Sequence, residues 1–178
     1  HCISSAASDV YKRQLYACGL RPGDHISLLM ENDLRYFEIA WGAYRSGLYI
    51  TCINRYLTAA EAAYIVNDSN SKALFASSAL DIAAALPELL ANCPHRFIKG
   101  DATADFEDYD AALEAHPTTP LAEQPAGDSM LYSSGTTGQP KGIKRPLSGQ
   151  HVSAGIPGVE PDNPCLLYTS PSPRDKRQ

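Results

Sequence analysis

Residues 130–143 read MLYSSGTTGQPKGI, and this stretch decides how the rest of the chain is interpreted. Met130, Leu131 and Tyr132 have strand propensity, and they run into small residues that bring hydroxyl groups or a flexible backbone. Glycine allows successive backbone N–H groups to point at one spot, hydroxyls add donors, and Lys141 adds a positive charge that suits phosphate oxygens. The pattern therefore predicts a phosphate-binding loop.

The residues around the lysine distinguish this loop from a Walker loop. A Walker loop requires GxxxxGK[ST] at the start of a helix, whereas Lys141 follows Pro140 and precedes Gly142. Residues 143–146 favour an extended chain, because a proline disfavours helix at the residue before it. We therefore expect a strand–loop–strand hairpin. The alternative is a glycine-rich hairpin that binds no ligand.

Residues 132–142 resemble the phosphate loop of the acyl-adenylate-forming (AMP-binding) superfamily, which includes acyl-CoA synthetases, luciferases and the adenylation domains of peptide synthetases. Residues 23–27 (GDHIS), 41–47 (WGAYRSG) and 54–58 (NRYLT) are similar, in order and spacing, to the N-terminal portion of acyl-CoA synthetases. The turn at 54–58 resembles acyl-CoA synthetases more than peptide-synthetase domains, which usually carry a proline-rich turn there. The resemblance implies an N-terminal fragment of an acyl-CoA synthetase.

Strand and helix signals alternate along the residues before the loop. Short apolar or β-branched runs predict strands at 25–30, 49–53, 72–76 and 96–99. Three helices are predicted from their N-terminal caps. The caps are Asn32 or Asp33 for the first helix, Thr58 in a capping box with Glu61 for the second, and Ser78 for the third. The third helix, at 79–91, is predicted to break at Pro87. This alternation predicts an α/β fold with a mostly parallel sheet and crossover helices. The resemblance makes it a partial N-terminal domain of an adenylate-forming enzyme.

One apolar stripe follows the period of a helix. Its members, at spacings of three and four, are Leu34, Phe37, Trp41, Tyr44 and Leu48, with Gly47 near the helix end. Period-3.6 patterning of this kind predicts a face packed in the core.

The region between the fourth strand and the loop is expected to be irregular. Residues 101–110 hold five carboxylates and are predicted to form a solvated loop. Residues 111–116 favour a helical turn, and three prolines keep 117–129 extended.

Both ends resemble engineered sequence. Residues 4–14 resemble an in-frame translation of a transposase adapter used for shotgun sequencing libraries, and residues 165–175 resemble the reverse complement of its partner. Such scars are set aside before fold reasoning. We therefore expect non-native segments at 1–14 and 165–178 around a partial AMP-binding domain at 15–164. The alternative is a natural chain with a basic tail.

Charge and cysteine content narrow the function classes. Residues 15–164 hold ten Lys and Arg against eighteen Asp and Glu, a net charge of −8, and they contain no basic run of the kind that nucleic-acid binding requires. No apolar run approaches the roughly 20 residues of a membrane helix. Cys18, Cys52 and Cys93 lack metal-like spacing, which favours reduced thiols and a cytoplasmic protein.

The resemblance implies a two-step reaction: a carboxylic acid attacks the α-phosphate of ATP to give acyl-AMP and pyrophosphate, and coenzyme A then displaces AMP. Carried onto this chain, the resemblance implies a set of residues that binds the β- and γ-phosphates of ATP. These residues are Ser133, Ser134, Gly135, Thr136, Thr137, Gly138 and Lys141. The resemblance also implies Mg²⁺, which prefers oxygen ligands and keeps most of its waters. The hydroxyl of Thr136 or Thr137 is the candidate ligand.

The chain departs from the family pattern at one point. Many relatives continue with a hydroxyl–histidine pair where residues 145–147 read RPL, so a histidine role there is in doubt. His151 is nearby and is read as exposed and idle, and the other histidines as structural. The family's catalytic lysine would lie beyond residue 164, so the fragment is not expected to turn over.

Fatty or other apolar acids are the expected substrates of the parent enzyme. The alternatives are an adenylation domain for aromatic or amino acids and a stand-alone nucleotide-binding module without chemistry.

Overall fold

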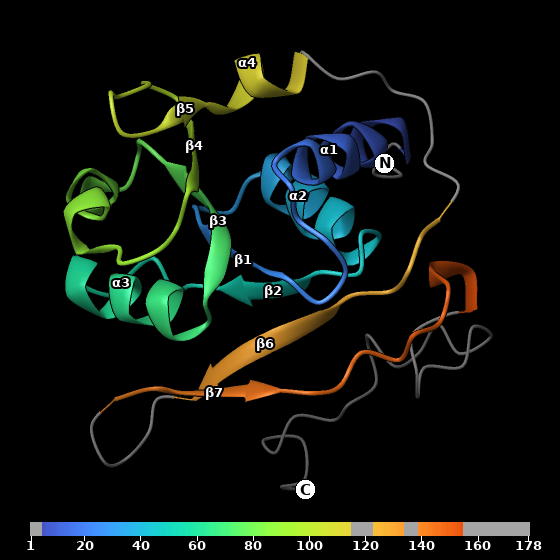
Figure 1. Ribbon diagram of the computed structural model, residues 1–178. Helices are drawn as coiled ribbons and strands as arrows, with labels where there is room; N and C mark the ends of the chain where they lie inside the picture. Colours follow the sequence, from blue (N-terminus) through green and yellow to red (C-terminus); the bar gives the residue numbers. More distant parts are fainter. Residues whose placement is uncertain (1–4, 115–122, 134–138, 155–178) are drawn as a thin grey trace, which may run out of the picture.

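The computed structural model describes residues 5–114, 123–133 and 139–154. Its helices and strands are, in chain order, α1 (Ser5–Ala17), β1 (His25–Leu29), α2 (Leu34–Tyr44), β2 (Tyr49–Cys52), α3 (Ala59–Asp68), β3 (Ser71–Ser77), η1 (Asp81–Ala85), η2 (Pro87–Leu89), β4 (His95–Lys99), β5 (Glu107–Asp108), α4 (Tyr109–Glu114), β6 (Asp128–Ser133), β7 (Lys141–Lys144) and η3 (Val152–Ala154). The four strands expected before the loop are confirmed, and so is the α/β class (Figure 1).

The strands form one sheet in the order β5-β4-β3-β1-β2-β6-β7. Every pairing is parallel except that of β7, which runs antiparallel to β6. Because β6 is parallel to β2, the residues that follow it leave from the same edge of the sheet as those that follow β1 and β2. This edge is where open parallel sheets bind ligands.

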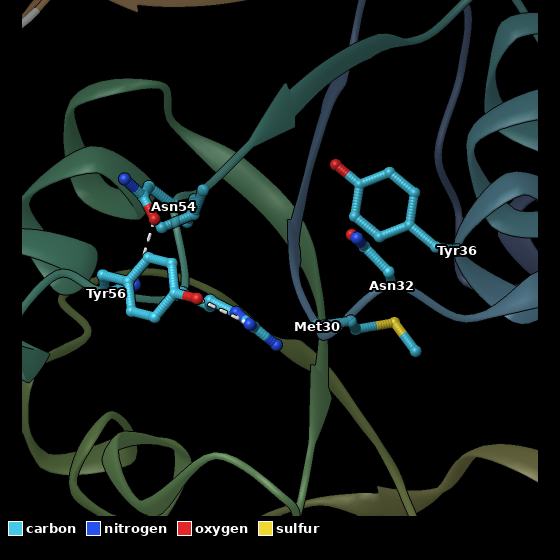
Figure 2. Close-up of a pocket in the computed structure, with 7 residues that line it drawn as sticks. Met30, Asn32, Tyr36, Asn54 and Tyr56 are labelled. Atoms are coloured by element: carbon cyan, nitrogen blue, oxygen red, sulfur yellow. Dashed lines mark hydrogen bonds between the residues drawn. The ribbon is translucent and has the colours of Figure 1, made fainter.

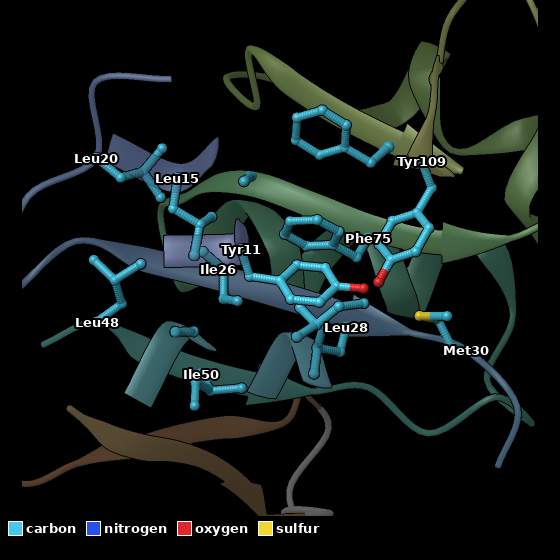
Figure 3. Packing of buried hydrophobic residues seen from close by; sticks show 14 residues of the cluster. Tyr11, Leu15, Leu20, Ile26, Leu28, Met30, Leu48, Ile50, Phe75 and Tyr109 are labelled. Atoms are coloured by element: carbon cyan, nitrogen blue, oxygen red, sulfur yellow. The ribbon is translucent and has the colours of Figure 1, made fainter. Parts of the chain in front are cut away.

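Helices cover both faces of the sheet. Residues of α1, α2 and α4 pack on one face against alternate strand residues such as Ile26, Leu28 and Phe75 (Figure 3). Residues of α3 and η1 pack on the other face against the intervening ones, such as Leu29 and Leu74. Each buried apolar side chain of this size contributes about 1.5–3 kcal/mol, so the two faces together hold the domain.

The predicted helix caps are present. The Asp33 carboxylate accepts a hydrogen bond from the backbone N–H of Arg35 at the start of α2. Thr58 and Glu61 form the reciprocal capping box of α3. Gly47 ends the α2 region with φ +72°, a left-handed conformation that favours glycine.

The predicted core stripe of α2 is wrong in its first three positions. Leu34, Phe37 and Trp41 are 78%, 57% and 40% exposed, whereas Ile39 and Ala43 face the sheet. Small residues such as Ala43 and Gly42 allow the helix to approach the sheet closely, and the bulky stripe is turned outward. Tyr44 packs against the core and Leu48 is buried, as predicted.

Two further predictions need correction. Residues 79–91 form two short 3₁₀ segments rather than one helix, although the break at Pro87 is confirmed because η2 begins there. Residues 101–110 are not only a solvated loop, because Phe106 is buried and β5 pairs with β4.

The first helix was not expected, because its residues lie mostly in the segment read as non-native. In the structure Tyr11 and Leu15 are buried, Tyr11 against Tyr109 with ring centroids 5.7 Å apart. Asp9 forms a buried ion pair of 2.8 Å with Arg45. The division at residues 1–14, 15–164 and 165–178 stays a prediction.

Two global properties follow from the described residues. None of the helices among them has the length and apolar character needed to cross a membrane. Cys18, Cys52 and Cys93 are free thiols.

Candidate phosphate-binding hairpin

β6 and β7 form the predicted hairpin. Their register pairs Met130 with Lys144, and Ser133 with Lys141 at the end nearest the tip. The structure therefore places the Ser133 and Lys141 side chains, both exposed, across from each other where the loop leaves the stem. Ser134, Gly135, Thr136, Thr137 and Gly138 lie outside the described residues.

Gly142 in the stem lies against two side chains of β6. A Cβ on Gly142 would overlap the Met130 methyl group and would lie 3.0 Å from the Tyr132 ring. A larger residue at 142 would therefore require the ends of the Met130 and Tyr132 side chains to move.

The middle of the hairpin is tied to α3. The Tyr132 hydroxyl donates to the Asp68 carboxylate at 2.6 Å, and the Tyr64 hydroxyl donates to the Pro140 carbonyl at 3.3 Å. Burial and then the Asp68 carboxylate raise the pKa of Tyr132 above its ordinary value. Tyr132 therefore stays a neutral donor over the whole working pH range.

The base of the hairpin is tied to β1 and β2. The Lys144 ammonium lies 2.9 Å from His25 Nε2 and 4.3 Å from the centre of the Tyr49 ring. Tyr49 in turn donates from its hydroxyl to the Arg145 carbonyl at 2.6 Å. Burial, and then the nearby Lys144, lower the pKa of His25 to about 4, so the imidazole is neutral at pH 7.

A cavity of about 290 Å³ opens at the carboxyl ends of β1 and β2, on the edge from which the phosphate loop leaves (Figure 2). It is lined by Met30, Asn32, Tyr36, Ile53, Asn54, Arg55 and Tyr56. The Arg55 guanidinium lies over the Tyr56 ring at 4.8 Å and donates to its hydroxyl at 2.6 Å. The lining includes a cation and no carboxylate, which suits an anionic or polar ligand.

Sequence reasoning named residues 54–58 only as part of the resemblance and assigned them no binding role. The available signal was their place directly after a parallel strand, where side chains from neighbouring strands converge.

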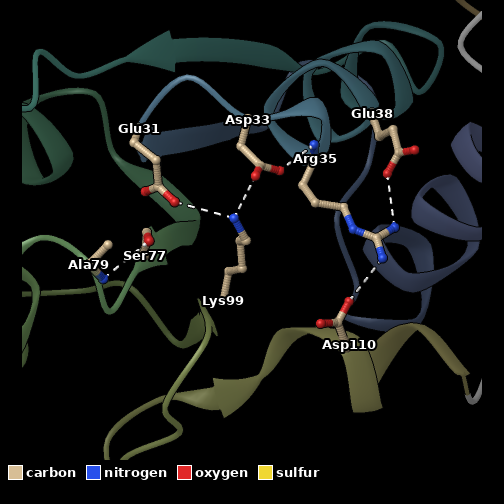
Figure 4. A network of polar contacts seen from close by, with 8 residues as sticks. All are labelled: Glu31, Asp33, Arg35, Glu38, Ser77, Ala79, Lys99 and Asp110. Carbon is tan, nitrogen blue, oxygen red and sulfur yellow. Dashed lines mark hydrogen bonds and ion pairs between the residues drawn. The ribbon is translucent and has the colours of Figure 1, made fainter. Parts of the chain in front are cut away.

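A charged network crosses the same edge nearby (Figure 4). Lys99, at the end of β4, lies 3.2 Å from Glu31 and 2.6 Å from Asp33. Arg35 bridges Glu38 and Asp110 at 3.1 and 3.3 Å. The hydrogen bond from Lys99 is the largest cause that lowers the pKa of Asp33. Each cation here is matched by carboxylates, so the network reads as a structural tie between β4 and α2.

The described residues contain no cluster of three or more His, Cys, Asp or Glu that could hold a metal ion. The candidate metal ligands, Thr136 and Thr137, lie outside that part of the chain.

Comparison with known proteins assigns the family. The family model described as "AMP-binding enzyme" matches residues 7–156. The chain belongs to this family. The expected superfamily and fold are thereby confirmed, including the mostly parallel sheet of the N-terminal domain.

The chain is 34% identical over 137 residues to the fatty acid–[acyl-carrier-protein] ligase ScoC of Streptomyces coeruleorubidus, covering 72% of this chain and 24% of that protein. It is 33% identical over 161 residues to the long-chain-fatty-acid–CoA ligase FadD13 of Mycobacterium tuberculosis, covering 86% and 30%. The solved anthranilate CoA ligase AuaEII, in complex with anthranoyl-AMP, superposes with a TM-score of 0.70 at 25% identity, covering 78% and 28%. The chain therefore spans about a quarter to a third of the length of these relatives.

Proposed function

We propose that this chain is part of an AMP-forming acid–thiol ligase, an acyl-CoA synthetase that activates a carboxylic acid with ATP and passes the acyl group to coenzyme A. The observation that carries the proposal is the hairpin, in which Ser133 faces Lys141 and the sequence SGTTGQP joins the two strands. Family membership and relatives named as ligases support the same reaction. The activity is proposed for the whole protein, of which this chain covers a part.

The chemistry explains why such a loop is needed. A carboxylate is a poor acyl donor because its charge repels nucleophiles and its oxygen leaves poorly. In the proposed first step a carboxylate oxygen attacks the α-phosphorus, the bond to the bridging oxygen breaks, and pyrophosphate leaves with the electron pair. In the second step the thiol of coenzyme A attacks the acyl carbon and AMP leaves. Neutralising the developing pyrophosphate charge is the largest help that a binding loop can give.

The proposed roles follow from side-chain chemistry. The hydroxyls of Ser133, Ser134, Thr136 and Thr137 donate hydrogen bonds to the β- and γ-phosphates, and Lys141 supplies a positive charge beside them. Gly135 and Gly138 let the backbone approach the phosphates.

Mg²⁺ fits this donor set. The loop offers hydroxyl oxygens and no carboxylate, which suits a cation that takes most of its ligands from phosphates and water. Thr136 or Thr137 would hold it, and the ion would shield the triphosphate charge.

We further propose that the acid is a fatty or other apolar one, and that the protein is cytoplasmic. Relatives named for fatty acids support the first point, whereas the relative named 4-hydroxybenzoate–CoA/benzoate–CoA ligase, from Rhodopseudomonas palustris, makes an aromatic acid the rival substrate.

The decisive experiment uses the protein encoded by the completed gene. Acid-dependent exchange of labelled pyrophosphate into ATP is measured with fatty, aromatic and amino acids. We expect exchange with the fatty acids. Exchange with aromatic acids alone would refute the proposed fatty-acid substrate and favour an aromatic one. Exchange with amino acids alone would refute the acyl-CoA synthetase assignment.

A binding experiment on the 178-residue chain tests the loop directly. Titration calorimetry with Mg–ATP compares the wild type with Lys141→Met, and with Lys72→Met as the matched control, because Lys72 lies on β3 and pairs with Asp24. A charge-assisted hydrogen bond is worth about 1.5–3 kcal/mol, so Lys141→Met should weaken binding roughly tenfold or more. Equal effects of the two variants would refute a specific role for Lys141.

A further inference from the structure

Backbone pairing holds the hairpin to the sheet only weakly. β6 pairs with β2 through two residue pairs, Tyr49 with Asp128 and Ile50 with Ser129. Beyond these pairs residues 130–133 continue without a partner on the β2 side, and β7 bonds to β6 alone in the described sheet. Every residue of β7 is exposed. Backbone hydrogen bonds also hold the segments that flank the hairpin, from the Gly127 N–H to Tyr44 and from the Ala126 N–H to Gln150, so side chains supply the contacts that β7 itself makes with β1 and β2.

Three side chains meet at the base of the hairpin, and we call them the base latch: His25 on β1, Tyr49 on β2 and Lys144 on β7. His25 and Tyr49 are paired in register, and their rings stack with centroids 4.7 Å apart and planes 23° apart. The Lys144 ammonium lies 2.9 Å from His25 Nε2 and 4.3 Å from the Tyr49 ring centre. One lysine thus reaches two strands that β7 does not pair with.

The backbone next to Lys144 is fixed by the same residues. The Tyr49 hydroxyl donates to the Arg145 carbonyl at 2.6 Å, and the Arg145 guanidinium pairs with Asp128 at 2.9 Å. Asp128 is the register partner of Tyr49. The row His25, Tyr49 and Asp128 therefore crosses three adjacent strands and binds the end of β7 at two points.

The charges around the base latch favour this arrangement. His25 is 8% exposed and neutral, so its Nε2 can accept from the Lys144 ammonium, and the Tyr49 ring face attracts the same cation. A second cavity, of about 340 Å³, lies beside the base latch, and both His25 and Lys144 line it. The other charged groups of its lining have partners of their own, since Lys72 pairs with Asp24 and Asp68 accepts from Tyr132.

We propose that His25, Tyr49 and Lys144 are positioning residues of the phosphate hairpin: they fix the base of β7 against β1 and β2 and so set where Lys141 and the loop point. The role of the loop rests on the proposed function, whereas the fixing of β7 does not. The base latch touches no reacting atom and acts only through the hairpin.

Lys144→Met is the test variant, because it keeps the side-chain length and removes both the hydrogen bond to His25 and the contact of the cation with Tyr49. Lys144→Arg is the conservative variant, since a guanidinium can donate to the imidazole and lie on the ring. Lys72→Met is the matched control, which removes a lysine charge from the same cavity but not from the hairpin. Hydrogen exchange of the backbone amides of residues 130–133 and 141–144 and Mg–ATP affinity are measured on the 178-residue chain, with urea unfolding as the control for global stability.

In Lys144→Met we expect hairpin amides to exchange about tenfold faster, as the loss of one charge-assisted hydrogen bond implies. Mg–ATP affinity should fall by about the same factor, the free energy of unfolding in urea should fall by no more than the roughly 1.4 kcal/mol that a tenfold change represents, and Lys144→Arg should restore exchange and affinity within about twofold. Unchanged exchange in Lys144→Met, or equal effects in Lys72→Met, would overturn the base latch. Faster exchange with unchanged affinity would overturn its positioning role. If the wild-type chain binds no Mg–ATP, the proposed function fails for this chain, and the exchange comparison alone decides whether the base latch fixes β7.

Discussion

Gln14 is the residue of α1 whose replacement should stabilise the protein most. Its side chain is 2% exposed, and neither its amide nitrogen nor its amide oxygen has a hydrogen-bond partner in the structure. Leu15, the next residue, is fully buried in the adjoining core. An amide in such a place loses its hydrogen bonds to water and gains none in return.

The expected gain can be worked from these facts. Each buried polar group without a partner costs about 1–3 kcal/mol, and methionine has nearly the same shape as glutamine, so Gln14→Met should add no strain. We expect the free energy of unfolding to rise by about 2 kcal/mol, which for a chain of this size raises the melting temperature by roughly 4–8 °C. Thermal and urea unfolding, followed by circular dichroism, measure both quantities.

Two matched variants make this prediction refutable. Gln14→Glu should destabilise strongly, because it buries a charge in the same place. Gln150→Leu removes an exposed glutamine and should change stability by no more than about 0.5 kcal/mol. A loss of stability in Gln14→Met would show that the amide is satisfied in solution and that the reasoning about α1 is wrong.

Three further predictions concern the described surface and its caps. Lys99→Met should lower the free energy of unfolding by about 1 kcal/mol at pH 7, after allowance for solvent screening. Lys99 lowers the pKa of Asp33 in the folded state. The stabilisation by Lys99 is therefore present above the ordinary aspartate pKa of about 3.9 and is lost as the pH falls through the lower pKa of the folded state. Urea unfolding of both proteins at pH 7 and pH 3 checks this, and a difference as large at pH 3 as at pH 7 would contradict it. Thr58→Ala should cost about 1 kcal/mol through loss of the capping box, and Thr58→Ser, measured in the same way, should recover most of it. The exposed apolar face of α2 predicts self-association of the isolated chain, and Phe37→Ser combined with Leu34→Ser should reduce it in light scattering without a large change in stability, since both side chains are exposed. Undiminished association in this variant would show that another surface causes it.

The sequence predicted those parts of the fold whose signals are local. Thr58 and Glu61 predict the start of α3, because both halves of the capping box lie within four residues. The hairpin was predictable because Pro146 favours an extended chain just before it and Tyr132 favours a strand before the loop. Strand signals at 25–30 and 49–53 were read correctly because buried parallel strands are short apolar runs.

The orientation of α2 could not be read from its pattern, because the helix carries two apolar faces. Ile39 and Ala43 form one face, and Leu34, Phe37 and Trp41 form the other. A helix that is apolar nearly all round is typically buried on both sides. Periodicity alone predicted that the face with the larger side chains lies in the core. In the structure the face with the smaller side chains packs on the sheet instead.

The base latch was invisible to sequence reasoning for a different reason. His25 and Lys144 are 119 residues apart, and nothing near His25 marks it as more than a structural histidine. Their contact exists because the strand order β1-β2-β6-β7 brings the end of β7 within reach of β1. The loop, in contrast, carries its chemistry in eleven consecutive residues. Its composition determines what it can bind, whereas the base of β7 is held by residues far away in the chain. Grafting residues 132–142 onto an unrelated hairpin should therefore transfer the hydroxyls, glycines and lysine without transferring the full affinity for phosphate.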